Sequence, residues 1–112
     1  MQLFDTHAHL GLIHDDPIEQ LLAVQEAKQV GVQAFVCISN NLIDFDKTYG
    51  QLRQDSAIYY SVGISPSEVE HLPAGWEERL TELAGLKRVV AIGETGLDYF
   101  RNYGDRDSQI NL

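Results

Sequence analysis

The chain has little cysteine: Cys37 is the only one among 112 residues. A single cysteine excludes an internal disulfide, and such scarcity is typical of proteins in a reducing cytoplasm. Cys37 lies in the apolar run from Ala34 to Ile38, which favours packing in the core over reactivity. We therefore expect a cytoplasmic protein whose thiol takes no part in chemistry.

Long apolar runs are absent as well. No stretch approaches the roughly 20 residues that a membrane helix requires. No basic segment followed by an apolar one opens the chain, so we expect no cleavable leader and no membrane contact. The sequence contains no repeat, low-complexity tract or linker, and we expect one domain unit over residues 1–112.

Basic residues are also few. Eight lysines and arginines stand against 17 aspartates and glutamates, which gives a net charge of −9. Nucleic-acid-binding proteins usually carry a basic face, and no Lys/Arg cluster occurs here, which counts against tight binding of extended DNA. It does not count against phosphodiester hydrolysis, because bound divalent metals can supply the positive charge that a phosphate needs.

Two histidines separated by one residue, His7 and His9, stand at the end of the first predicted strand. The apolar pattern of that strand covers residues 2–6. Side chains alternate between the faces of a strand, so residues of equal parity are expected on one side. Two neighbouring imidazoles on a rigid element form half of a metal site. Asp5 shares their parity, and we expect it either to orient a histidine or to be a hydrogen-bonded structural residue.

A second, acidic motif runs from Gly93 to Tyr99 and follows the predicted strand over residues 88–93. Glu94 comes directly after this strand, where it is either a metal ligand or a hydrogen-bonded loop carboxylate. Asp98 and Tyr99 are expected either to orient Glu94 or contact substrate, or to have a structural role in the loop. Arg101 is expected either to contact a phosphate or to lie solvated on the surface.

Strand-like and helix-like patterns alternate between the two motifs. Asp16-Pro17-Ile18-Glu19 is typical of a helix start, with an apolar stripe at Ile18, Leu21, Leu22 and Val30 and with Gly31 placed to end the helix. The other predicted elements are strands over 33–38 and 57–64, helices over 44–53 and 76–86, and a helix capped by Asp105. This order predicts an α/β fold with a parallel sheet and right-handed crossovers.

In such folds, functional sites form at the carboxyl ends of the strands. His7, Ser65 and Glu94 each follow a predicted strand, so all of them are expected on the same rim of the sheet. His14 and His71 belong to no such motif and are expected in loops or at the surface.

With both motifs in view, the chain resembles the N-terminal part of the TatD family of metal-dependent hydrolases. The matching residues are Phe4-Asp5-Thr6-His7-Ala8-His9-Leu10 and Gly93-Glu94-Thr95-Gly96-Leu97-Asp98-Tyr99. The resemblance implies a TIM-type (β/α)8 barrel, of which this chain provides about four β/α units and is truncated after the fourth strand. It also implies two divalent ions (zinc, magnesium or manganese) and DNase-like phosphodiester hydrolysis by metal-activated water. A whole barrel takes about 250 residues.

Carried over residue by residue, the resemblance implies that His7 and His9 bind the first metal and that Glu94 bridges both. The family's remaining ligands, two histidines and an aspartate that is also the base, have no position in this chain. We therefore identify no catalytic residue and expect this chain alone to be inactive. The family's Gly-x-His-Pro-His pattern after the third strand is replaced by Gly63-Ile64-Ser65-Pro66-Ser67, which puts the substrate contacts of that loop in doubt.

Two other functions stay open beside a phosphodiesterase that acts on DNA. The same barrel and metals could hydrolyse amide or ester substrates, since a fold does not determine its substrate. The chain could instead be a non-catalytic half-barrel that self-associates through its open sheet edges.

Overall fold

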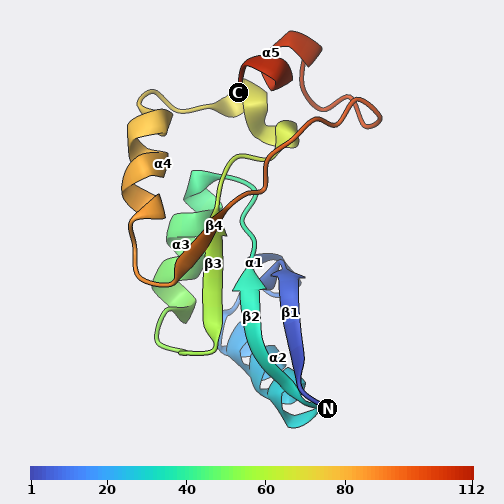
Figure 1. Ribbon diagram of the computed structural model, residues 1–112, viewed down its shortest axis with the longest axis vertical. Coiled ribbons are helices and arrows are strands. Elements are labelled where there is room, and N and C mark those ends of the chain that lie inside the picture. The colour runs from blue at the N-terminus through green and yellow to red at the C-terminus, as the bar shows by residue number, and fades with distance from the viewer.

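The computed structural model describes residues 1–112 and contains a four-stranded parallel sheet with helices between the strands (Figure 1). The elements in chain order are β1 (Leu3–Ala8), α1 (Leu10–Ile13), α2 (Pro17–Gln29), β2 (Val32–Cys37), α3 (Leu42–Leu52), β3 (Ile58–Val62), the 3-10 helix η1 (Pro66–His71), α4 (Trp76–Ala84), β4 (Val89–Ile92) and α5 (Arg106–Asn111). The strand order is β1-β2-β3-β4, and each neighbouring pair is parallel. The predicted α/β fold is confirmed, and it is consistent with the first half of a (β/α)8 barrel.

The core lies between the sheet and the helices that pack on one of its faces. Tyr60 of β3 and Phe45 of α3 are fully buried, and their rings meet edge to face with centroids 6.1 Å apart. Cys37 of β2 belongs to the same core, as predicted. Burial raises the pKa of the Cys37 thiol to about 11, so the thiol stays protonated and unreactive near neutral pH.

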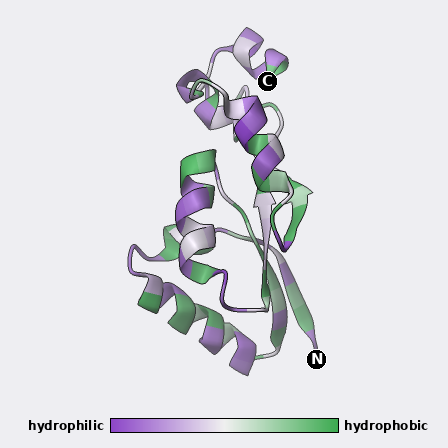
Figure 2. Cartoon of the chain, turned by 90° about the vertical axis from the view of Figure 1, so that its left-hand side faces the viewer, coloured by the Kyte–Doolittle hydropathy of each residue, from purple (hydrophilic) through white to green (hydrophobic).

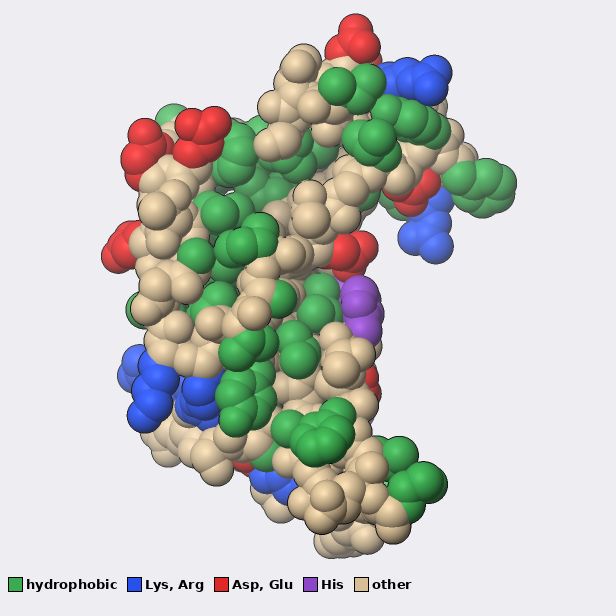
Figure 3. Space-filling model, in the orientation of Figure 1, with side chains coloured by type: hydrophobic (Ala, Val, Ile, Leu, Met, Phe, Trp, Pro, Cys, Tyr) green, Lys and Arg blue, Asp and Glu red, His purple; other side chains and the backbone are tan.

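The opposite face of the sheet carries no helix, and its edge strands remain exposed. Phe4 of β1 is 66% exposed, and Val90 and Ile92 of β4 are 57% and 58% exposed. Figure 3 shows hydrophobic side chains gathered over the middle of the molecule in this view. The two sides of the sheet therefore differ in their environment, although a nearly continuous apolar run such as residues 33–38 is typical of a strand buried on both sides.

The predicted helix starts are set by side-chain caps. The Asp16 carboxylate accepts a hydrogen bond from the backbone N–H of Ile18 at 2.8 Å, so α2 begins at the predicted place. Helix α3 begins two residues before the predicted residue 44 because the Asn41 side chain caps it, accepting a hydrogen bond from the backbone N–H of Asp44 at 2.9 Å. None of the helices has the length and apolar character needed to cross a membrane.

The predicted apolar stripe of α2 is wrong for most of its members. The exposed residues of that stripe are Ile18, Leu22 and Val30. Gln20 and Val24 face the core instead, and the Gln20 amide donates a hydrogen bond to the carbonyl oxygen of His14 at 2.6 Å. Hydrophobic residues occur on more than one side of this helix (Figure 2), so their spacing does not decide which side is buried.

An ion pair joins α2 to the turn before β3. Lys28 Nζ donates to both Asp55 carboxylate oxygens at 2.8 and 2.6 Å, and the backbone N–H of Ala57 donates to one of them at 2.9 Å. Burial alone would raise the pKa of Asp55, but these donors outweigh it and hold that pKa below the usual 3.8. A carboxyl whose pKa is lower in the folded state stabilises the fold above its unfolded pKa, and this stabilisation is lost as the pH falls through the folded pKa.

We expect Asp55→Asn to lower the free energy of unfolding near neutral pH by roughly 2 kcal/mol, since hydrogen bonds to a charged group contribute about 1.5–3 kcal/mol. The difference from wild type should shrink as the pH falls below 3.8. Urea unfolding as a function of pH measures both. Asp46→Asn, which removes an exposed partner of Arg79, is the control and should change stability little. A difference for Asp55→Asn that stays constant with pH would contradict this assignment.

Candidate metal centre

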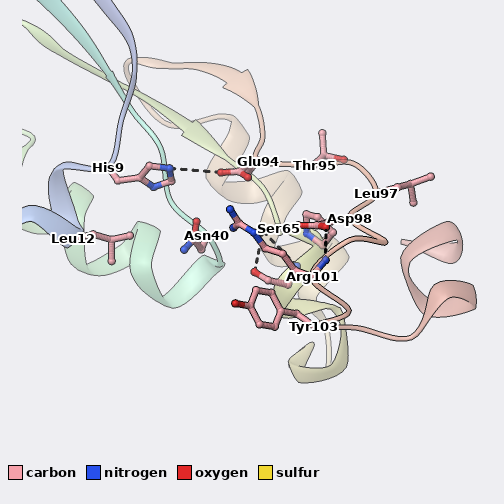
Figure 4. Close-up of a pocket in the computed structure, with 12 residues that line it drawn as sticks. His9, Leu12, Asn40, Ser65, Glu94, Thr95, Leu97, Asp98, Arg101 and Tyr103 are labelled. Carbon is pink, nitrogen blue, oxygen red and sulfur yellow. Dashed lines mark hydrogen bonds and ion pairs between the residues drawn. The ribbon is translucent and has the colours of Figure 1, made fainter.

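Three side chains that can ligate a metal meet at the carboxyl ends of β1 and β4. The Nε2 atoms of His7 and His9 lie 3.2 Å apart, and Glu94 Oε2 lies 3.8 and 3.7 Å from them, respectively. Figure 4 shows His9 and Glu94 pointing toward each other from opposite sides of the site. The structure thus brings together the three residues that the sequence had proposed as ligands, although they lie at the ends of the two edge strands of the sheet.

His9 reaches this position from a turn and not from the strand itself. Strand β1 ends at Ala8, and His9 stands at the N-terminal boundary of α1 with φ −86° and ψ 65°. The strand register also shifts: from Asp5 to Ala8, three residues of β1 advance beside two of β2. Strand parity alone therefore does not explain why the two imidazoles lie together.

Asp5 contacts the backbone of the first histidine. Its Oδ1 atom accepts a hydrogen bond from the His7 backbone N–H at 3.0 Å, and the carboxylate makes no hydrogen bond with either imidazole. This contact holds the end of the strand through its backbone, so Asp5 has a structural role and does not orient either ring. His14 and His71 are both exposed and lie outside the cluster.

The position of Glu94 depends on Gly63, which follows β3. A Cβ atom at residue 63 would lie 2.5 Å from the carbonyl carbon of Gly93 and 2.8 Å from the carbonyl oxygen of Glu94, closer than side chains approach backbone. Only glycine lets the chain after β4 pass this close. Sequence reasoning did not identify Gly63 as a site residue, because its neighbours come from the next strand along the sheet.

The three ligand atoms are spaced as a bound metal ion requires. Zinc binds histidine nitrogen at about 2.0–2.1 Å with tetrahedral geometry, which places neighbouring ligand atoms roughly 3.3 Å apart. The observed separations run from 3.2 to 3.8 Å. His9 Nδ1 is buried without a hydrogen-bond partner, so Nε2 is the ring atom available to a ligand. Two imidazoles and a carboxylate suit zinc, and the carboxylate also suits magnesium or manganese.

A cleft with a volume of about 530 Å³ opens beside these ligands (Figure 4). Its lining is mostly polar and consists of His9, Leu12, Asn40, Ser65, Pro66, Ser67, Glu94, Thr95, Leu97, Asp98, Arg101 and Tyr103. The hydroxyl oxygens of Ser65 and Ser67 lie 3.0 Å apart on one wall. The loop after β3 therefore presents two hydroxyl groups to the cleft. They lie at the two positions that are histidines in the Gly-x-His-Pro-His pattern of the family.

Asp98 and Tyr99 shape the loop that follows Glu94. The Asp98 carboxylate accepts hydrogen bonds from the backbone N–H groups of Phe100 and Arg101 at 3.1 and 3.0 Å, and makes none with Glu94. Tyr99 does not line the cleft, and the Arg106 guanidinium lies 4.3 Å from its ring centroid. Arg101, by contrast, lines the cleft together with Glu94.

The family model and the similar proteins point to the same family. A family model described as TatD related DNase matches residues 4–112. A protein named "3'-5' ssDNA/RNA exonuclease TatD" from Shigella flexneri serotype 5b is 34% identical over 86 residues, which cover 77% of this chain and 33% of that protein. The "Uncharacterized metal-dependent hydrolase YabD" of Bacillus subtilis is 30% identical over 108 residues, which cover 96% of this chain and 42% of that protein. The chain thus spans about a third to two fifths of the length of these relatives.

We expect Gly63→Ala to displace Glu94 and to weaken zinc binding roughly 10-fold to 100-fold, the range seen when residues that orient metal ligands are changed. Isothermal titration calorimetry with zinc measures the effect. Gly50→Ala is the matched control, because a Cβ at this exposed position of α3 meets nothing within 4 Å and improves helix propensity. Equal zinc affinity in the two variants would refute the role assigned to Gly63.

Proposed function

The chain belongs to the TatD family of related DNases. From this premise we propose that it supplies the part of a phosphodiester hydrolase's active site that binds the first metal ion. The observation that carries the proposal is the convergence of His7, His9 and Glu94 on one point beside a polar cleft. The domain over residues 1–112 is then the N-terminal part of a barrel whose later strands complete the site.

Each of the three residues has a defined role in this proposal. His7 and His9 would each offer Nε2 to a divalent ion, and the two carboxylate oxygens of Glu94 would serve this ion and a second one. A divalent ion held there would lower the pKa of a bound water and stabilise charge on a phosphoryl oxygen. Gly63 keeps the backbone of Glu94 against the end of β3, so the carboxylate stays within reach of both imidazoles.

The chain's own residues do not supply a proton acceptor for the attacking water. Asp98, the other carboxylate of the cleft, is engaged by the loop backbone. We therefore propose that the base and the remaining ligands come from outside these 112 residues, and that the chain alone turns over little substrate.

A nucleic acid is the substrate class that the relatives' names favour, since several are named as ssDNA/RNA exonucleases. The net charge of −9 is compatible with this choice, because the metal ions supply positive charge where the phosphate binds. Amide or ester hydrolysis in the same centre is the alternative outcome. A cytoplasmic location, inferred from the single cysteine, belongs to the same proposal.

We expect the double substitution His7→Ala/His9→Ala to weaken zinc binding by more than roughly 100-fold, because both nitrogen ligands are removed. His14→Ala/His71→Ala removes the other two histidines and should bind zinc as the wild type does. Titration calorimetry gives the affinities. The same samples, supplied with zinc, magnesium or manganese, are assayed on a single-stranded oligonucleotide and on amide and ester substrates. Equal loss of zinc affinity in the two double variants would contradict the proposed metal centre.

We propose in addition that the chain self-associates through its uncovered sheet face and edges. The outer strands β1 and β4 each have one edge without a partner, and they carry the exposed side chains of Phe4, Val90 and Ile92. Only 22 of 112 residues are buried, so much apolar surface remains in contact with water. Strand edges of this kind pair with other strands unless they are covered or charged.

The molar mass of the purified chain, measured by light scattering after size exclusion, tests this second proposal. We expect a multiple of the 12.6 kDa chain mass for the wild type and a return toward the single chain for Val90→Lys. Ile43→Lys changes a similarly exposed residue on α3, away from the sheet face, and should keep the larger mass. A monomeric wild type would exclude self-association.

A further inference from the structure

Three of the five arginines of this acidic chain have side-chain partners within the protein, whereas the side chains of Arg53 and Arg101 have none. Lys28 and Arg79 pair with carboxylates, Arg88 donates to backbone carbonyls, and Arg106 covers an aromatic ring. The Arg101 side chain makes no ion pair or hydrogen bond with the protein, although 17 carboxylates are available in the sequence. A guanidinium without a protein partner is free to bind an anionic ligand.

The Arg101 side chain extends into the cleft, toward the side on which Asn40 and Glu94 lie (Figure 4). It is the only lysine or arginine among the lining residues. The neutral groups that share the cleft with it, the Ser65 and Ser67 hydroxyls and the Asn40 amide, can donate hydrogen bonds to oxygen atoms. A planar guanidinium binds phosphate with two parallel hydrogen bonds, which fixes the orientation of the phosphate as well as its position.

The loop that carries Arg101 is held at both ends by one buried amide. Gln109 of α5 donates hydrogen bonds to the carbonyl oxygens of Asp98 and Gly104 at 3.2 and 2.9 Å, and its carbonyl oxygen accepts one from the Asp98 backbone N–H at 2.8 Å. The Asp98 carboxylate in turn binds the backbone N–H of Arg101 at 3.0 Å. The backbone from which Arg101 projects is therefore fixed, whereas an ordinary surface arginine has no such support.

From these observations we propose that Arg101 binds a phosphate group of a nucleic-acid strand in the cleft beside Glu94. The inference rests on the proposed function of the metal centre and adds to it a residue that selects a phosphate-bearing substrate. The sequence alone had left Arg101 between a phosphate contact and a solvated surface position. Its place in the cleft, without a protein partner, favours the phosphate contact.

The probe for this proposal is a short fluorescein-labelled oligothymidylate. Its binding is followed by fluorescence anisotropy over a series of salt concentrations, with zinc present because the metal centre supplies positive charge beside the phosphate. We expect Arg101→Met to weaken binding roughly tenfold and to lower the salt slope by about 0.7, the value for one phosphate contact on a single strand. Arg101→Lys should keep the salt slope and recover only part of the affinity, since an ammonium group cannot make the bidentate contact of a guanidinium. Arg53→Met removes the same charge from the C-terminal end of α3, before β3 begins, and should behave as the wild type does.

Zinc titration of the same variants separates this proposal from that of the metal centre. Arg101→Met should bind zinc like the wild type. Wild-type affinity and salt slope in Arg101→Met would overturn the phosphate contact, as would a wild type that fails to bind the oligonucleotide. Loss of zinc and oligonucleotide binding together in Arg101→Met would also overturn it, because Arg101 would then act through the fold. Zinc binding that does not depend on His7 and His9 would instead count against the metal centre.

Discussion

The convergence of the two edge strands at their carboxyl ends is the constraint on which the candidate site depends. Strands spaced by about 4.8 Å would leave β1 and β4 roughly 14 Å apart in a flat sheet. Yet His7 Nε2 and Glu94 Oε2 lie only 3.8 Å apart. The twist and curvature of the parallel sheet, together with the reach of the Glu94 side chain, close this distance. Any change that opens the sheet therefore separates the ligands.

The packing of the helices on one face of the sheet supports this curvature. The Phe45 and Tyr60 rings fill the space between α3 and β3, and the Lys28–Asp55 ion pair ties α2 to the turn before β3. At the other end of β3, Gly63 lets the backbone of β4 pass close enough to place its ligand. The stability of the core and the geometry of the site are thus linked through a single strand.

The sequence predicted the features that are local or that follow from topology. The cap at Asp16 needs only its neighbours, and His7 and Glu94 follow predicted strands whose carboxyl ends must share one edge of a parallel sheet. The buried side of α2 was missed because its hydrophobic residues occur on more than one side of the helix. Gly63 and Gln109 were missed because their contacts come from residues that only the folded chain brings near. Nothing in their own sequence neighbourhoods marks them.

The central claim, that one divalent ion is held by both edge strands, is tested most directly by crystals grown with zinc. An anomalous difference map recorded above the zinc absorption edge locates the ion without reference to activity. We expect one strong peak at about 2.0–2.2 Å from His7 Nε2, His9 Nε2 and Glu94 Oε2. A map with no peak between these three atoms, or with zinc bound only at His14 or His71, would contradict the claim.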